Sequence, residues 1–421
     1  MKNTTTAQSA VWHPYTQMQT AGRFPLIVKG EGAWLFDEDG NKYLDAVSSW
    51  WTNLHGHAHP QIAAAIAAQA KQLEHVIFAG FTHQPAEELA HRLLQHIPYH
   101  TKVFYSDNGS TAVEAAIKMA LQYWANRGEK RNKIIAFRDA YHGDTFGAMS
   151  VSARGVFTNA FSSLLFDVAF IDTPNGSNTD EVRGQLLAAL SAVDVAAFIF
   201  EPLVLGSAGM LMYDAEVLNA LIGICKENGV LAIADEVMTG FGRTGKFLAT
   251  DHCTNKPDII CLSKGITGGF LPFAATTCTA TVYNAFLSDD KAKMLFHGHS
   301  YTGNPLGCAA ALASLTVFET DNTLAKIERI AECHAGFALR LKLLPAAAKV
   351  RQQGTILALD LKTTDEGYLS GIRDKAYNYF LGRGIILRPL GNVIYILPPY
   401  CISEPELGLV YTAIEDFCRS L

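Results

Sequence analysis

The sequence predicts an α/β fold, with a mainly parallel sheet between helices in a large domain and a second, smaller α+β domain. Three observations lead to this prediction. From about residue 60 onward, short apolar runs alternate with amphipathic helical segments. At 421 residues the chain is long for one compact core, which favours two lobes. Hydrophobic residues make up 49% and charged residues 18%, which is typical of a globular rather than a disordered chain.

The expected elements follow the chain in order. Antiparallel strands are expected in FPLIVKGEGAWLFDEDG and NKYLDAV, and an alanine-rich helix begins at Pro60. Strands and helices then alternate through KVFYSD, TAVEAAIKMALQYWANRG and KIIAFRDA, and later through AAFIFEP, AEVLNALIGICKENG, VLAIADEV and DIICLSKG. After a helix over about 305–320 we expect a hairpin in GIILRPLGNVIYILPPY and a C-terminal helix in PELGLVYTAIEDFCRSL. These elements predict an N-terminal segment over 1–59 that packs with the small domain, a large domain over 60–310 and a small domain over 311–421.

Charge and composition exclude several classes of protein. The formal net charge is −6 and no basic block is present, which argues against nucleic-acid and membrane-surface partners. The N-terminus has no apolar secretion core, and the longest uncharged stretch, over 265–288, is too polar to span a membrane. The eight cysteines form no C-x-x-C pair and are expected to be reduced, mostly buried thiols. We therefore predict a cytoplasmic protein.

Three strand ends carry polar residues at the edge where parallel sheets bind their ligands. The first is SDNGST over 106–111, which opens a well-patterned helix. Gly109 allows close backbone approach, and Ser110 and Thr111 add hydroxyl groups where a helix N-terminus presents free N–H groups. This suits a phosphate cradle, although Ser, Asp and Asn also cap ordinary helices, and the motif alone favours a plain cap.

The other two strand ends carry a carboxylate and an amine. Asp235 ends the apolar strand VLAIAD, where it suits a protonated ring nitrogen or a metal, or equally a helix cap or salt bridge. Lys264 follows the strand in DIICLSKG and precedes a glycine-rich stretch without charges. A desolvated lysine has a lowered pKa and suits a Schiff base, whereas a surface lysine is the commoner alternative. Together, the amine, the carboxylate and the phosphate site are what pyridoxal phosphate requires.

The motifs around these residues resemble those of a known family. Asp235 is followed by GFGRTGK, and Lys264 lies twenty-nine residues further on in SKGITGG. This is similar to the class III (ω-)aminotransferases of pyridoxal-phosphate fold type I, along nearly the whole chain. Further segments resemble the branch of the class that converts 8-amino-7-oxononanoate to 7,8-diaminononanoate in biotin biosynthesis. They are WHPYTQM (12–18), SSWW (48–51), YHGDTFGAMSV (141–151), HGHSYTGNPLGCA (297–309) and LRPLGNVIYILPPY (387–400).

The resemblance implies a role for each matching residue. Lys264 would hold the cofactor as a Schiff base and move protons, Asp235 would pair with the ring nitrogen, and Tyr141 would stack on the ring. The phosphate would be bound by Gly109 and Ser110 and, from the neighbouring subunit of a homodimer, by Gly298, His299 and Ser300.

For the substrate, the resemblance implies that Arg388 holds the carboxylate of the oxononanoate, because a planar guanidinium suits such a group. Tyr395 would lie close to Arg388, Tyr15 and Trp50 would line the substrate site, and Arg243 would contribute to it. Tyr141, Lys264 and Gly298 would adjoin the same site. Without the resemblance, simple alternatives explain these residues: Tyr15 could pack within a loop, Trp50 could belong to the core, and Arg388 could lie on a surface strand.

Two positions depart from the pattern of the class. His299 and Ser300 stand where many adenosylmethionine-using members carry Pro-Thr, and similar segments occur in relatives that take lysine. S-adenosylmethionine is nevertheless the predicted amino donor, because WHPYT and SSWW resemble its users, and lysine is the alternative. Leu205 stands where the class usually carries a glutamine near the ring oxygen, which another group or water must then satisfy.

Two other functions remain as alternatives. Within the class, the substrate could be ornithine, 4-aminobutyrate or a diamine, or the reaction a decarboxylation or aminomutation, since the fold does not separate these. Outside it, His55, His57 and His59 would share one face of a strand and suggest a metal-binding protein. Pro60 follows at once and no carboxylate or cysteine cluster accompanies them, so no metal is predicted. Stoichiometric zinc in the purified protein would favour the metal hypothesis.

Overall fold

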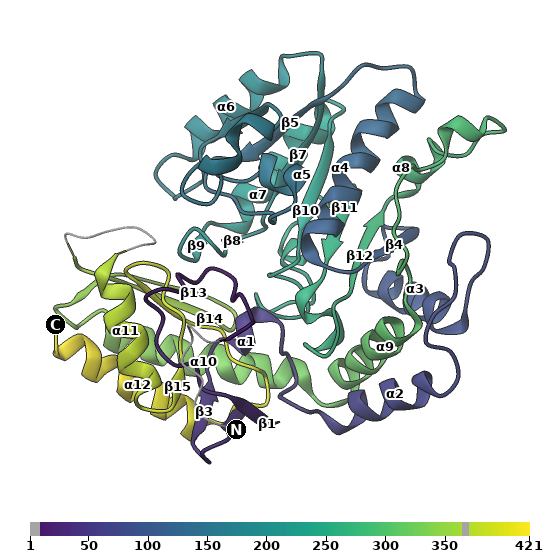
Figure 1. The fold of residues 1–421 in the computed structure, drawn as a ribbon. Helices are drawn as coiled ribbons and strands as arrows, with labels where there is room; N and C mark the ends of the chain where they lie inside the picture. Colours follow the sequence, from purple (N-terminus) through teal and green to yellow (C-terminus); the bar gives the residue numbers. More distant parts are fainter. Residues whose placement is uncertain (1–8, 364–369) are drawn as a thin grey trace.

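The computed structural model describes residues 9–363 and 370–421. Its centre is a seven-stranded sheet in the order β4-β12-β11-β10-β7-β5-β6 (Figure 1). β12 is antiparallel to both of its neighbours, and the other pairs are parallel. The α/β class with a mainly parallel sheet is therefore confirmed. The strands span Lys102–Ser106 (β4), Lys133–Phe137 (β5), Val168–Ile171 (β6), Val195–Phe200 (β7), Leu231–Asp235 (β10), Ile259–Leu262 (β11) and Ala274–Cys278 (β12).

Helices cover both faces of this sheet, which explains why its central strands are apolar throughout. Every residue of β7 and β10 is buried. Along β7, Ala197 and Ile199 belong to one core cluster together with residues of α4 (Gly109–Asn126). Phe198 belongs to a second cluster together with residues of α7 (Ala215–Glu227). Since neither face of these strands is open, ligands must approach the sheet at the ends of its strands.

The described residues also form three smaller sheets. Their orders are β1-β2-β3-β15, β13-β14-β16 and β8-β9. The strands span Ile27–Glu31 (β1), Trp34–Asp37 (β2), Lys42–Asp45 (β3), Val204–Leu205 (β8), Leu211–Met212 (β9), Ala347–Gln353 (β13), Ile356–Leu361 (β14), Ile385–Ile386 (β15) and Val393–Ile396 (β16). The antiparallel strands predicted near the N-terminus are confirmed as β1, β2 and β3.

The hairpin predicted over 384–400 is wrong. β15 lies parallel to β3, whereas β16 lies antiparallel to β14, so the two strands belong to different sheets. Pro389 lies between them and has no N–H to donate to a strand ladder. Arg388 consequently lies on a connection between two sheets rather than within a strand.

The predicted helices that begin at Pro60, cover 305–320 and end the chain are confirmed as α2, α9 and α12. The remaining α-helices are α1 (Ser48–Trp51), α3 (Gln84–His96), α5 (Phe146–Ser150), α6 (Thr179–Leu190), α8 (Ala280–Asn284), α10 (Thr323–Leu341) and α11 (Gly371–Leu381), beside α2 (Pro60–Ala70), α9 (Pro305–Thr320) and α12 (Glu404–Arg419). Short 3₁₀ turns cover Asn159–Leu164, Ala249–His252, Lys264–Thr267 and Lys291–Lys293. None of the helices in the described ranges is long and apolar enough to cross a membrane.

Segments from the N-terminal and C-terminal parts of the chain meet in the sheet β1-β2-β3-β15, with the N-terminal strands in purple and the C-terminal part in yellow-green (Figure 1). The boundary predicted after residue 310 falls within α9, which runs without a break from Pro305 to Thr320. The division into domains stays a prediction.

Candidate active site

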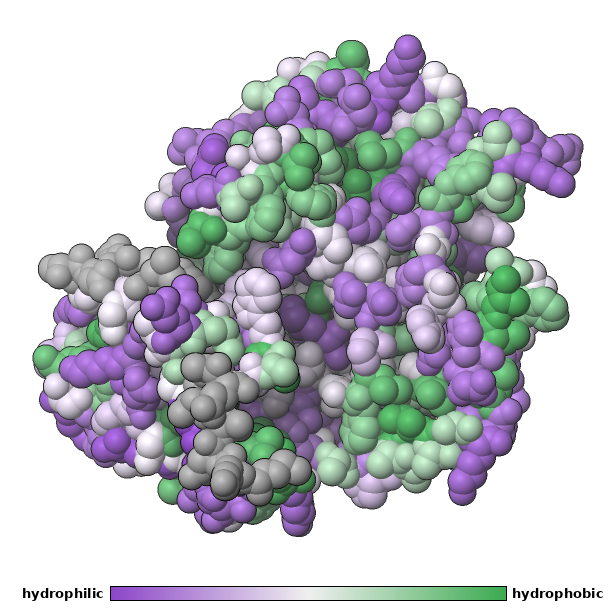
Figure 2. Space-filling model, viewed as in Figure 1, coloured by the Kyte–Doolittle hydropathy of each residue, from purple (hydrophilic) through white to green (hydrophobic). Residues whose placement is uncertain are grey.

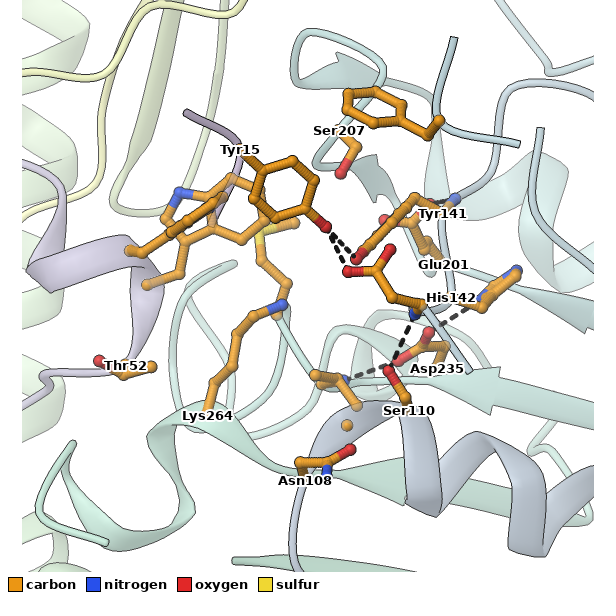
Figure 3. A pocket seen from close by; sticks show the side chains of 18 of the residues that line it. Tyr15, Thr52, Asn108, Ser110, Tyr141, His142, Glu201, Ser207, Asp235 and Lys264 are labelled. Carbon is orange, nitrogen blue, oxygen red and sulfur yellow. Dashed lines mark hydrogen bonds and ion pairs between the residues drawn. The ribbon is translucent and has the colours of Figure 1, made fainter. Parts of the chain in front are cut away.

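A cavity of about 510 Å³ lies at the carboxyl ends of the central strands. Figure 2 shows this face of the molecule hollowed near its middle, and Figure 3 shows side chains from several elements directed into one space. The three predicted strand ends all contribute: Gly109 and Ser110 follow β4, Asp235 ends β10, and Lys264 follows β11. The structure thus brings together the predicted amine, carboxylate and helix N-terminus.

Lys264 directs its amine into this cavity (Figure 3). Its Nζ lies 4.8 Å from the centre of the Trp51 ring. Burial lowers the pKa of Lys264 below its ordinary value, and the charge of Arg243 lowers it further, while Asp235 and Glu201 raise it. A larger share of this amine is therefore neutral, and so nucleophilic, than in a lysine in water.

Asp235 is buried at the end of β10, with 4% of its surface exposed. Its Oδ2 accepts a hydrogen bond from His142 Nδ1 at 2.7 Å, and its Oδ1 accepts one from the backbone N–H of Val237 at 3.1 Å. His142 is itself buried, and its Nε2 has no partner among the described residues. The carboxylate is thus fixed in orientation and lines the cavity. Its contact with His142 is also the salt bridge that was one of the alternatives, provided that the imidazole is protonated.

At the start of α4, one residue caps the helix and the next two face the cavity. Asn108 is the cap, because its side chain accepts from the N–H of Thr111 while the hydroxyl of Thr111 accepts from the N–H of Asn108. Gly109 and Ser110 line the cavity. A Cβ on Gly109 would lie 2.7 Å from Val237 Cγ1, so the position requires glycine. The plain-cap explanation therefore applies to Asn108, whereas the next two residues face the cavity at a helix N-terminus, a position that suits an anion.

Aromatic side chains form the opposite wall of the cavity. The hydroxyl of Tyr15 donates to Asp144 Oδ2 and lies 3.5 Å from the hydroxyl of Tyr141 (Figure 3). The Tyr15 ring meets the Trp50 ring edge-on, with 5.6 Å between centres. Burial, and next the hydrogen bond with Tyr15, raise the pKa of Tyr141 above its ordinary value. Tyr141 therefore stays a neutral phenol near neutral pH.

Arg388, Tyr395 and Arg243 lie behind this wall, and none of them is among the lining residues. The Arg388 guanidinium lies 4.2 Å from the centre of the Trp50 ring, and no ion pair joins it to a described carboxylate. Tyr395 is buried, and its hydroxyl accepts from Trp51 Nε1 at 3.1 Å. Arg243 is fully buried and donates to backbone carbonyl groups. The sequence predicted that Arg243 contributes to the substrate region. Within this chain, however, Arg243 contacts the backbone of the lining residue Trp51 and does not itself line the cavity.

The segment Gly298–Ser300 is not brought to this cavity. Gly298, His299 and Ser300 line a separate cavity of about 450 Å³ beside Phe78 and Phe104. These residues are predicted to bind the phosphate in the cavity of a second subunit. Their position within a single chain does not test that role, which stays a prediction.

Several lining residues were missed in the sequence. Glu201 directly follows β7, much as Asp235 ends β10, so its signal was present in FEPL. It accepts the backbone N–H groups of Tyr141 at 2.9 Å and Gly206 at 3.0 Å, and burial raises its pKa to about 7. Ser207 lines the cavity, whereas Leu205 is fully buried two residues earlier. Asp144, the partner of Tyr15, and His142, the partner of Asp235, belong to the YHGD motif, in which only Tyr141 was singled out from the sequence.

The three histidines do not lie on a strand, so the geometry that suggested a metal site is wrong. His55 bonds to Ser314 Oγ at 3.2 Å, and His57 to Asp45 Oδ2 at 2.9 Å. The ring of His59 lies 6.1 Å from that of His55. Across residues 9–363 and 370–421, no cluster of three or more potential metal ligands is found.

The donor set of the large cavity fits pyridoxal phosphate. A glycine cradle at the start of an 18-residue helix suits its phosphate. Asp235 offers a fixed carboxylate for a protonated ring nitrogen, and Lys264 offers a desolvated amine for an aldehyde. These groups lie around one cavity, and each matches a different part of the cofactor: the phosphate, the ring nitrogen and the aldehyde.

Comparison with known proteins gives relatives along the whole chain. Residues 16–418 match the family model Aminotransferase class-III. The chain is 48% identical over 415 residues to the adenosylmethionine-8-amino-7-oxononanoate aminotransferase of Synechococcus elongatus, covering 96% of this chain and 97% of that protein. The solved structure of the protein of that name from Methanocaldococcus jannaschii is similar with a TM-score of 0.92 and 40% identity, over 98% and 97% of the two chains. An amine transaminase from an uncultivated Pseudomonas species, solved with pyridoxal phosphate bound, is similar with a TM-score of 0.91 and 32% identity, over 98% of each chain.

Proposed function

The chain belongs to the class III aminotransferases, and we propose that it converts 8-amino-7-oxononanoate to 7,8-diaminononanoate in biotin biosynthesis. The observation that carries this proposal is similarity along the full length to relatives named for that reaction, at 48%, 42% and 41% identity. Because those relatives are also named for adenosylmethionine, we propose S-adenosylmethionine as the amino donor. Lysine is the second candidate, favoured by the His299-Ser300 pair.

Class III aminotransferases use pyridoxal phosphate, and we propose that this chain holds it in the large cavity. When bound, the cofactor supplies an aldehyde that takes up and passes on an amino group, and a ring that delocalises charge from the reacting carbon. Gly109 and Ser110 would bind its phosphate, Tyr141 would stack on its ring, and Asp235, oriented by His142, would keep the ring nitrogen protonated. Lys264 would hold the cofactor at its aldehyde carbon.

Lys264 also moves the proton on which amino transfer depends. Within each half of the reaction, its Nζ would carry a proton between the substrate carbon that bears nitrogen and the aldehyde carbon of the cofactor, in opposite directions in the two halves. Burial keeps a share of this amine neutral, so it can act as a base near neutral pH. The amino donor and the oxononanoate use the same cavity in turn, and Tyr15, Trp50 and Phe157 form one wall of it.

We place the carboxylate of the oxononanoate at Arg388. This guanidinium stacks on Trp50 beside the cavity, is half-buried and has no described carboxylate partner. It is therefore available for an incoming carboxylate, which it can bind through two parallel hydrogen bonds. Tyr395, which supports Trp51, orients the same wall.

We also propose a homodimer. Large apolar side chains are exposed around the second cavity: Ile77 at 60%, Phe81 at 63% and Phe296 at 59%. A second copy of the chain would cover them and bring Gly298–Ser300 to its partner's phosphate cradle. Sedimentation equilibrium measures this directly, and we expect a mass of about twice 45.8 kDa. A species of single-chain mass at micromolar concentration would contradict the dimer.

We place the reaction in the cytoplasm. All eight cysteines are free, as expected in a reducing compartment. The small-molecule substrates need no membrane or nucleic-acid surface. The net charge of −6 also does not favour binding to such negatively charged surfaces.

The absorption spectrum of the protein loaded with cofactor tests the proposed reaction. Addition of 7,8-diaminononanoate should convert the aldehyde band of the bound cofactor to the band of its amine form, because this compound drives the reverse half-reaction with either donor. Ornithine and 4-aminobutyrate serve as controls and should leave the band unchanged. S-adenosylmethionine and lysine can then be ranked by the same conversion. A band that responds to the controls but not to 7,8-diaminononanoate would leave an aminotransferase of the class with a different substrate.

A further inference from the structure

The segment Ser48–Trp51 is one turn of left-handed helix. Its φ angles are 51°, 46°, 72° and 73°, and Ser49 and Trp50 have ψ angles of 48° and 50°. The backbone N–H of Trp51 donates to Val47 O, and that of Thr52 to Ser48 O, both at 2.9 Å. Residues other than glycine, asparagine and aspartate rarely adopt this backbone conformation, even one at a time. A run of four such residues must therefore be held by its surroundings.

Arg243 holds the end of this turn, while the hydroxyl of Ser48 at its start donates to Leu397 O at 2.7 Å. The Nη2 of Arg243 donates to Trp51 O at 3.2 Å and to Asn53 O at 3.3 Å, and its Nη1 donates to Pro398 O at 2.9 Å. The guanidinium is fully buried and forms no ion pair with a described carboxylate. Because a buried charge without a counter-charge is costly, its carbonyl contacts must compensate for that cost. Burial itself lowers the pKa of Arg243.

The turn places two adjacent tryptophans against two different groups of the site. Trp50 lies under the guanidinium of Arg388, and Trp51 lies under the amine of Lys264. The whole run from Ser49 to Thr52 lines the cavity. On a strand, adjacent side chains would point to opposite faces, and only one of the two tryptophans would reach this space.

We propose that Arg243 is a positioning residue: it holds the left-handed turn so that Trp50 supports Arg388 and Trp51 supports Lys264. Arg243 then affects the acceptor carboxylate and the reactive amine through the turn, without touching the substrate. The assignment of the Arg388 end depends on the proposed function, whereas the coupling of Arg243 to the two tryptophans does not.

Arg243→Met removes the donors while keeping a side chain of similar length. The measurements are acrylamide quenching of tryptophan fluorescence, the near-ultraviolet circular dichroism, and the KM for 8-amino-7-oxononanoate. We expect stronger quenching, a weaker aromatic dichroism signal and a KM raised at least tenfold. The gain in quenching should vanish in the triple variant R243M/W50F/W51F, which assigns it to these two tryptophans. Unchanged quenching and dichroism in Arg243→Met, whatever its KM, would overturn the proposal.

Ser49 provides a matched pair of variants, because it is exposed and its hydroxyl donates only to Asp45 Oδ2. Ser49→Gly and Ser49→Val both lose this hydrogen bond, but glycine accepts a positive φ and valine strongly resists it. We expect the Val variant to show the quenching and dichroism changes of Arg243→Met, and the Gly variant to stay near wild type. Equal behaviour of the two would overturn the need for a left-handed turn and, with it, the proposal, even if Arg243→Met fails to fold. The two optical measurements need no substrate, so they hold even if the oxononanoate proves not to be one.

Discussion

Replacement of Lys264 by alanine should lower kcat about 10⁴-fold or more while the protein still binds pyridoxal phosphate. Positioned proton transfer alone contributes about 10²–10⁴-fold in enzymes, and the same amine also acts as the nucleophile. Among the described residues that line the cavity, Lys264 carries the one amine, so no neighbour can take over both tasks. Steady-state turnover and equilibrium dialysis of the cofactor measure the two parts of this prediction.

Lys226→Ala is the matched control, since Lys226 lies exposed in the last turn of α7, away from the cavity. It should keep wild-type turnover. Addition of a small primary amine, such as methylamine, to the Lys264→Ala protein should restore part of the rate, because the vacated space can admit a free base. Rapid multiple turnover by Lys264→Ala without added amine would contradict the role assigned to this residue.

Replacement of Arg388 by alanine should raise the KM for 8-amino-7-oxononanoate roughly 10- to 100-fold. A hydrogen-bonded pair of charged groups contributes about 1.5–3 kcal/mol, which corresponds to this range. The loss should fall on the acceptor, because the guanidinium is placed for its carboxylate, and a donor amine without a carboxylate should be less affected. Initial-rate measurements with each substrate varied in turn separate the two KM values.

Arg383→Ala serves as the control, because Arg383 also stacks on an aromatic ring, that of Tyr379, but lies exposed at the end of α11. The methyl ester of the oxononanoate provides a second comparison, since it lacks the charge and should be an equally poor substrate for the wild type and for Arg388→Ala. An equal rise of KM for the acceptor and for a carboxylate-free amine donor would show that Arg388 has another role.

The sequence predicted the parts of the site that follow from strand ends. Asp235 and Lys264 each end an apolar run, and parallel strands bring such ends to one edge, so their meeting could be expected. Glu201 directly follows β7 in a similar way and was overlooked because no motif drew attention to it. Pairwise contacts such as His142 with Asp235 could not be expected, because side-chain directions within a loop leave no periodic signal.

Two structural features had no local signal in the sequence. The left-handed turn contains no glycine, and its conformation depends on Arg243 from a segment nearly 200 residues away. The hairpin predicted over 384–400 looked favourable because two apolar runs flank Gly391, but Ile385 and Ile386 pair with Leu44 and Asp45 instead. In both cases a distant partner, rather than local preference, decides the backbone.

The pairing of β3 with β15 has a consequence for the order in which a newly made chain can fold. The seven strands of the central sheet all lie between residues 102 and 278, so this sheet can form while the rest of the chain is still being synthesised. Strands β1, β2 and β3 pair with one another, but the other edge of β3 must wait for β15, which leaves the ribosome more than 300 residues later, a delay on the order of 15 s or more at typical rates of synthesis. Because Arg388 follows β15 directly, and Pro398 O holds Arg243, the carboxylate end of the site should be the last to form.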